Sequence, residues 1–168
     1  MVREADLLVV GGGVAGLSAA LTAATAGAEV VLLSKGSLIS SNSYVAQGGI
    51  AAALAADDTP ELHAADTLTA GRGLCKESAV RLLTVEAPAR ISELERFGVV
   101  FDPGLGREGG HSRRRIVHAG GAETGKRIAE TLAARVRAQR RITISEGERV
   151  LTLWRADGRC IGAATYPV

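Results

Sequence analysis

The first part of the chain alternates apolar runs with an Ala- and Leu-rich segment, in the pattern of a β-α-β unit. Residues 6–10 and 29–33 are apolar runs of strand length, and continuous runs of this kind are typical of strands buried on both faces. Residues 14–26 predict a helix that ends at Gly27. A helix between two such strands implies a parallel pair joined by a right-handed crossover.

The rest of the chain predicts loops, further helices and short strands. Residues 36–49 are rich in Ser, Asn and Gly and predict a long loop of the kind that carries function, and residues 102–112 predict a second, glycine-rich loop. Helices are predicted at residues 60–70, 124–139 and 76–97, the last as two helices joined near Pro88 and ended by Gly98. Strands are predicted at residues 99–101, 116–117 and 141–145, and a β-hairpin at residues 150–154 and 160–166 around Ala156, Asp157 and Gly158.

These elements predict an α/β fold, Rossmann-like, with helices on both faces of a parallel sheet and a C-terminal β-hairpin. The 168 residues fit one domain that spans residues 1–168. Hydrophobic residues make up 46% and aromatic residues only 3%, so the core is expected to consist of Ala, Val, Leu and Ile.

Composition and charge exclude several classes of function. A net charge of +2, with 23% charged residues, gives no support for nucleic-acid binding. Cys75 and Cys160 lack metal-ligand spacing and are expected to be reduced thiols. No signal-like segment or apolar run of membrane-spanning length is present, so we expect a cytoplasmic protein without membrane contact.

A glycine motif follows the first predicted strand directly. Gly11, Gly13 and Gly16 satisfy GxGxxG between a strand and a helix. The first glycine permits the tight turn, the second lets the backbone approach a pyrophosphate, and the third allows close packing of helix on strand. The helix N-terminus then offers free N–H groups to a phosphate. The motif therefore predicts a dinucleotide site.

The end of the second strand leaves the choice of nucleotide open. Dinucleotide folds usually carry Asp or Glu there to bind a ribose, whereas this chain has Ser34 and Lys35. Lys35 could bind a phosphate, which keeps NADP open beside FAD and NAD, or it could be a solvated lysine at the end of a strand.

A segment of the long loop resembles a known family. Residues 41–50, SNSYVAQGGI, resemble the SxxxAQGGI segment of the succinate dehydrogenase, fumarate reductase and L-aspartate oxidase flavoproteins, whose second strand also ends in Ser-Lys. The resemblance continues through residues 66–75, 98–102, 107–115 (REGGHSRRR) and 116–119, where it is closest to the L-aspartate oxidase branch. It covers essentially the whole chain but only the N-terminal part of the family, so the capping domain, the C-terminal helical domain and the catalytic arginine are expected beyond Val168.

The resemblance implies non-covalent FAD. Membrane succinate dehydrogenases attach FAD through a histidine that falls at Asn42 here, and asparagine cannot form that bond. Residues 12–15 would contact the pyrophosphate, Lys35 the adenosine half, and residues 42–49 the flavin. The cofactor-binding positions are thus expected to be Gly11, Gly12, Gly13, Val14, Ala15, Gly16, Ser34, Lys35, Asn42, Ser43, Tyr44, Val45, Ala46, Gln47, Gly48 and Gly49.

The resemblance also assigns one substrate residue. Glu108, in REGG, matches the glutamate that orients the substrate's amino group, although it could also be a surface acid. The basic run at residues 113–115 could be a dicarboxylate clamp, but a solvated run is favoured because three adjacent arginines cannot all enter one pocket. His111 and His118 are expected to be structural hydrogen-bonding residues, and no metal site is expected. Ala122 stands where the family has Asp.

The function implied by the resemblance is the FAD-dependent oxidation of L-aspartate to iminoaspartate, the first step toward quinolinate in NAD biosynthesis. Oxygen or fumarate would be the electron acceptor, and quinolinate synthase is the implied partner. The chain alone is expected to have low or no activity. Two alternatives stay open, a soluble flavoprotein of the fumarate reductase or succinate dehydrogenase type and a non-enzymatic FAD-binding fragment.

Overall fold

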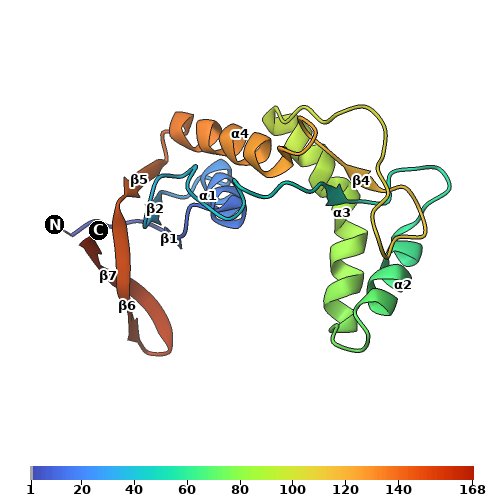
Figure 1. The fold of residues 1–168 in the computed structure, drawn as a ribbon. Helices are drawn as coiled ribbons and strands as arrows, with labels where there is room; N and C mark the ends of the chain where they lie inside the picture. Colours follow the sequence, from blue (N-terminus) through green and yellow to red (C-terminus); the bar gives the residue numbers. More distant parts are fainter. Residues whose placement is uncertain (1) are drawn as a thin grey trace. The chain divides into compact units, whose positions relative to one another are not determined.

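The computed structural model describes residues 2–168, which divide into two compact units (Figure 1). The first unit contains residues 2–45 and 128–168, and the second contains residues 46–127.

A three-stranded parallel sheet forms the centre of the first unit. Its strands are β1 (Leu7–Val10), β2 (Val30–Ser34) and β5 (Ile142–Glu146), with β2 in the middle. All five residues of β2 are buried, as expected for a central strand that is covered on both faces. The predicted parallel sheet is therefore confirmed, with boundaries shifted by one residue or so.

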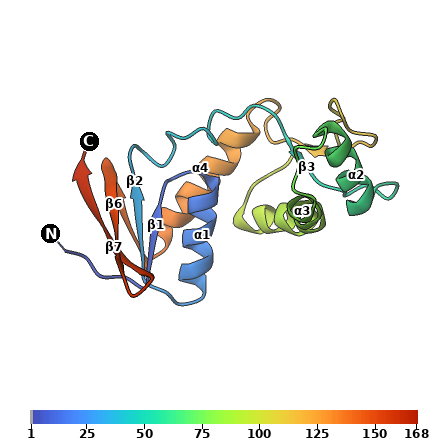
Figure 2. The same ribbon diagram turned by 90° about the horizontal axis from the view of Figure 1, so that it is seen from below.

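Two helices cover one side of this sheet. Helix α1 (Val14–Thr25) buries residues at helical spacing, and α4 (Thr124–Ala138) does the same along the part that belongs to the first unit. In both views α1 and α4 lie on the same side of β1 and β2, and the hairpin lies on the other side (Figures 1 and 2). The buried helical side chains are Leu17, Ala20, Leu21, Ala24, Ile128, Ala129, Leu132, Ala133 and Val136. The second face of the sheet thus carries β-structure where a second layer of helices was expected.

The predicted C-terminal hairpin is confirmed and is longer than predicted. It pairs β6 (Glu148–Ala156) with β7 (Arg159–Pro167). The two turn residues, Asp157 and Gly158, have φ of 49° and 75°, which is the conformation of a type I′ turn. An Asp-Gly pair is a preferred sequence for this turn, which explains why the hairpin could be predicted.

The second unit contains two short strands and two helices. Strand β3 (Ile50–Ala51) pairs antiparallel with β4 (Ile116–Val117), and the helices are α2 (Pro60–Ala70) and α3 (Glu77–Phe97). The hydrophobic core of this unit is made by Ala52, Ala87, Ile91 and Val117, with Ile50, Phe101 and Leu105 packed against it. The bounds of α2 and β4 agree with the prediction.

Two predictions for this unit were wrong. Helix α3 is one continuous helix with Pro88 inside it, because the buried positions Val80, Thr84, Ala87 and Ile91 form a single stripe on both sides of the proline. Residues 99–101 form no strand. They follow Gly98, whose φ of 105° ends α3 in a left-handed cap.

No helix within residues 2–168 is both long and apolar enough to cross a membrane.

Candidate functional site

The glycine motif lies between the end of β1 and the start of α1, as predicted. Gly11 has a φ of 111°, and its N–H donates to the carbonyl oxygen of Leu33 on β2 at 2.8 Å. Gly13 is the N-terminal cap residue of α1, and no side chain caps this helix end by a hydrogen bond from that position. The N–H of Val14 binds a serine of the long loop, and the other N–H groups of the first turn of α1 can donate to a phosphate.

The glycines differ in what surrounds them. A Cβ at Gly16 would lie 1.9 Å from the carbonyl oxygen of Gly11, so this position tolerates only glycine. A Cβ at Gly12 would lie 2.9 Å from the side chains of Ser34 and Leu38. At Gly13, by contrast, the nearest atom would be a serine hydroxyl at 3.4 Å. Gly13, like Gly11, is thus a position where free space adjoins the backbone, as a closely approaching pyrophosphate requires.

The serine beside Gly13 comes from the long loop. Ser43 Oγ accepts a hydrogen bond from the N–H of Val14 at 3.3 Å, and the next residue, Tyr44, donates its hydroxyl to Glu130 on α4 at 3.4 Å. The first unit therefore brings Ser43 to the glycine motif, 29 residues away along the chain. Lys35 and Asn42 are exposed, whereas Ser34 is buried.

The residues of the first unit fit a dinucleotide. They provide a helix N-terminus, open space at Gly13 and a hydroxyl at Ser43, which together suit a pyrophosphate. The remaining predicted positions divide between the units, since residues 42–45 belong to the first unit and residues 46–49 belong to the second.

The second unit contains an open hollow of about 700 Å³. Its lining includes Gln47 and Gly48 from the long loop and Glu108 from the glycine-rich loop. His118 and Asp102 also line it. Glu108 Oε1 lies 3.9 Å from His118 Nε2, and the two side chains are 56% and 31% exposed. The hollow thus combines an acidic and a basic side chain, both open to a ligand.

The turn after His118 is stabilised without the aspartate that Ala122 replaces. The N–H groups of Gly120 and Gly121 donate to the Asp102 carboxylate at 3.0 and 2.8 Å, and these bonds lower the pKa of Asp102. The Ala119 N–H donates to the hydroxyl of Thr124 at 3.1 Å. Ala122 itself lines the hollow.

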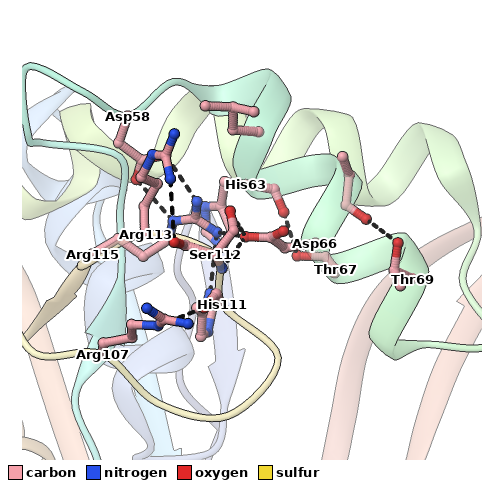
Figure 3. A network of polar contacts seen from close by, with 12 residues as sticks. Asp58, His63, Asp66, Thr67, Thr69, Arg107, His111, Ser112, Arg113 and Arg115 are labelled. Carbon is pink, nitrogen blue, oxygen red and sulfur yellow. Dashed lines mark hydrogen bonds and ion pairs between the residues drawn. The ribbon is translucent and has the colours of Figure 1, made fainter.

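A buried ionic network lies beside the loop that carries Glu108 (Figure 3). The side chain of Arg115 is fully buried, and its Nε and Nη2 donate to the two oxygens of Asp58, each at 2.8 Å. Its Nη1 donates to Asp66 at 2.7 Å. The favoured interpretation of residues 113–115 as a solvated run is therefore wrong for Arg115, and this residue is equally unavailable as a clamp because both carboxylates bind it.

The same network holds the glycine-rich loop. Asp66 Oδ2 accepts the N–H and the hydroxyl of Ser112 at 2.7 and 2.8 Å. Desolvation opposes ionisation of Asp66, but the bonds from Ser112 and Arg115 outweigh it and lower the pKa of Asp66 to about 2. On the other side of Glu108, the Gly106 N–H donates to the Ile116 carbonyl on β4 at 2.8 Å, and Arg107 Nε donates to the His111 carbonyl within the loop at 3.0 Å. Glu108 therefore stands on a loop that is anchored on both sides.

Two histidines complete the network. His111 Nδ1 lies 3.2 Å from Arg115 Nη1, so its predicted structural role is supported by a hydrogen bond in which Arg115 donates. His63 is buried with no partner for Nδ1, and burial together with Arg115 and His111 lowers its pKa. Sequence reasoning did not identify Asp58 or His63, because no local spacing relates them to Arg115.

No group of three or more His, Cys, Asp or Glu side chains that could hold a metal ion occurs among the described residues.

Comparison with known families gives a match over almost the whole chain. The family model described as "FAD binding domain" matches residues 6–167. The L-aspartate oxidase of Streptomyces coelicolor is 45% identical over 168 residues, which cover 96% of this chain and 29% of that protein. The L-aspartate oxidase of Mesorhizobium japonicum is 46% identical and covers 94% of this chain and 32% of its own length. The chain thus spans about a third of the length of these curated relatives.

Solved structures share the fold. The Sdh1 complex of Mycobacterium smegmatis in the apo form matches 97% of this chain and 31% of its own chain, with a TM-score of 0.91 and 29% identity. A flavocytochrome c3 fumarate reductase in an open conformation matches 97% and 30%, with a TM-score of 0.89 and 29% identity.

Proposed function

Since the chain belongs to the FAD binding domain family, we propose that it is the FAD-holding part of an enzyme that oxidises L-aspartate to iminoaspartate. The observation that carries this proposal is the glycine motif at the N-terminus of α1, where open space adjoins Gly13 and the hydroxyl of Ser43 stands beside it. The names of the relatives support L-aspartate as the substrate.

The residues of the first unit would hold the pyrophosphate and the adenosine half of FAD. The N–H groups at the start of α1 would bind the pyrophosphate, with Gly13 allowing its approach and Ser43 adding a hydroxyl. Lys35, exposed just after β2, would lie by the adenosine half. The backbone of residues 46–49 would contact the flavin. Asn42 cannot form the covalent bond that a histidine makes at this position, so FAD would be held without a covalent link.

FAD, when bound, supplies the electron-accepting ring system, and the protein supplies position and charge. In the hollow of the second unit, the Glu108 carboxylate would accept hydrogen bonds from the ammonium group of the substrate. Anchoring of its loop through Ser112 and Gly106 would keep Glu108 in place while the substrate binds.

A second candidate function is that of a soluble fumarate reductase or succinate dehydrogenase-type flavoprotein. The likeness to the fumarate reductase and Sdh1 structures supports it. Glu108 favours L-aspartate, because fumarate and succinate carry no ammonium group for a carboxylate to bind. A non-enzymatic FAD-binding fragment is the third candidate. The electron acceptor (oxygen or fumarate), the partner (quinolinate synthase), the place in NAD biosynthesis and the cytoplasmic location are proposed from the resemblance.

The cofactor proposal is tested by purifying the chain and recording its visible absorption after addition of FAD. We expect the folded chain to show a flavin spectrum. When the chain is denatured and filtered, the flavin should pass into the filtrate. A folded chain that stays colourless would contradict FAD binding, and colour that remains on the denatured chain would contradict the argument from Asn42.

Gly13→Ala tests the position of the pyrophosphate, and Gly109→Ala is its matched control. The methyl group at Gly13 would meet only the Ser43 hydroxyl at 3.4 Å, so folding should survive while the pyrophosphate position is blocked. No atom lies within 4 Å of a Cβ at Gly109, so this variant should bind FAD normally. We expect FAD affinity to fall about tenfold or more in the first variant only; equal affinities would place the pyrophosphate elsewhere.

A further inference from the structure

His118 and Glu108 both line the hollow of the second unit, and the two side chains lie next to each other. We propose that His118 binds substrate: its Nε2 binds a carboxylate of an amino acid whose ammonium group is bound by Glu108. This inference rests on the proposed function of Glu108 and adds a second binding residue to it. From the sequence, His118 was expected only to form structural hydrogen bonds within the protein.

The imidazole ring occupies a slot between two glycines. A Cβ at Gly49 would lie 3.1 Å from His118 Cδ2, and a Cβ at Gly106 would lie 2.8 Å from His118 Cε1. Cδ2 and Cε1 are the two ring atoms that flank Nε2, so the Nε2 edge of the ring is held from both sides. Side chains at either glycine would displace the ring from this position.

The backbone of His118 is fixed as well. Its carbonyl oxygen accepts the Asp102 N–H at 2.7 Å, and it directly follows β4, which pairs with β3. On the other side, the Gly106 N–H donates to the carbonyl of Ile116 at 2.8 Å. The ring therefore projects from a short sheet whose neighbouring segments are both hydrogen-bonded, and such a support gives the precision that a binding group needs.

The distance between the two side chains suits a ligand with two charges. Glu108 Oε1 and His118 Nε2 are 3.9 Å apart, which is beyond the range of a hydrogen bond. Neither atom is therefore hydrogen-bonded to the other, and both can bind a ligand. An amino acid carries an ammonium and a carboxylate on one carbon. Such a zwitterion can accept from Nε2–H and donate to Glu108 at once, replacing one long ion pair by two charge-assisted hydrogen bonds.

The other acid near His118 is already bound. Both oxygens of Asp102 accept backbone N–H groups, from Gly120 and Gly121. The carboxylate of Asp102 is therefore occupied by backbone hydrogen bonds, and Glu108 is the carboxylate that remains available to bind an ammonium group. This arrangement predicts selectivity for an ammonium group at Glu108 and for a carboxylate at His118.

The test uses the whole chain and its NMR spectrum. The chain has only three histidines, so the imidazole Cε1–H signals can be assigned by single substitutions. L-aspartate is titrated into the wild type, His118→Phe, His118→Gln and Glu108→Gln, and succinate is titrated as a dicarboxylate without an ammonium group. Phenylalanine fills the slot but has no N–H, whereas the glutamine amide can place a donor near the position of Nε2.

We expect L-aspartate to shift the His118 signal and leave that of buried His63 unchanged. His118→Phe should lower the affinity for L-aspartate about tenfold or more. His118→Gln should keep much of the wild-type affinity. The affinity for succinate should fall in His118→Phe but should be unchanged in Glu108→Gln. A purely structural ring would give the reverse order, because phenylalanine fills the slot better than glutamine does.

Besides the reverse order, three outcomes would overturn the inference. One is wild-type affinity for L-aspartate in His118→Phe, and another is equal loss in His118→Phe and His118→Gln. If Glu108→Gln still weakens L-aspartate in either case, the proposed function stands and only the role of His118 falls. If L-aspartate perturbs neither the wild-type histidine signals nor any signal that depends on Glu108, the inference and the substrate proposal both fail. The cofactor proposal is independent of this result, because FAD binding is measured by a separate experiment.

Discussion

The ionic network of Arg115 gives the sharpest prediction about stability. Asp58→Asn keeps the size of the side chain and one acceptor oxygen, but it removes the charge that binds two nitrogens of Arg115 at 2.8 Å. The side chains of both residues are fully buried, so no water can replace the lost partner. Breaking a buried pair on one side typically costs about 3–5 kcal/mol. Asp66 still binds Nη1, so we expect a loss of unfolding free energy at the lower end, about 3 kcal/mol.

The control is an ion pair of similar length on the surface. Glu77 Oε1 lies 2.6 Å from Arg81 Nη2 on α3, with side chains 61% and 59% exposed, and such pairs contribute about 0–1 kcal/mol. Urea unfolding of Asp58→Asn and Glu77→Gln, followed by circular dichroism, measures both losses through the shift in midpoint at an unchanged slope. Equal shifts in the two variants would refute the argument that burial makes the Arg115 network a main support of the second unit.

Three further predictions concern pH and one helix. The pKa of Asp66 is about 2 in the folded chain against an ordinary 3.8, so its contribution to stability is complete above about pH 4 and is lost as the pH falls toward 2; an acid titration followed by circular dichroism should show this loss, and Asp66→Asn should reduce it. Burial lowers the pKa of His63 from 6.5, so the unfolded chain takes up its proton first and stability should decrease as the pH falls below about 6.5; urea midpoints should show a smaller decrease in His63→Gln. Pro88→Ala should raise the unfolding free energy by about 1 kcal/mol or more, because it restores a backbone hydrogen-bond donor inside the continuous helix α3, and a lower urea midpoint would show that the ring of Pro88 is needed for packing.

The parts of the fold that were predicted correctly depend on local signals. The glycine motif between β1 and α1 and the Asp157-Gly158 turn are set by backbone conformations that few residues adopt. Helix α2 begins at Pro60, after Thr59, whose hydroxyl accepts the Leu62 N–H at 3.2 Å. Each of these signals lies within a few residues of the structure that it determines, so the sequence alone was sufficient.

The parts that were missed depend on contacts between distant residues. The two carboxylates that bind Arg115 lie 57 and 49 residues away along the chain, and no spacing rule connects them. Helix α3 passes through Pro88 because tertiary burial of one stripe offsets the lost hydrogen bond. Strand β3 has only two residues and forms by pairing with β4, which is distant along the chain.

The ionic network and the hollow are connected through one loop, which has a consequence for variants far from the proposed substrate. Arg115 fixes Asp66, Asp66 binds Ser112 by two hydrogen bonds, and Ser112 lies four residues after Glu108. Substitutions at Asp66 should therefore weaken amino-acid binding more than they weaken FAD binding, because the glycine motif belongs to the other unit. Parallel titrations of Asp66→Asn with L-aspartate and with FAD measure the two effects. Equal losses would mean that the network supports the fold as a whole, and that the position of Glu108 does not depend on it.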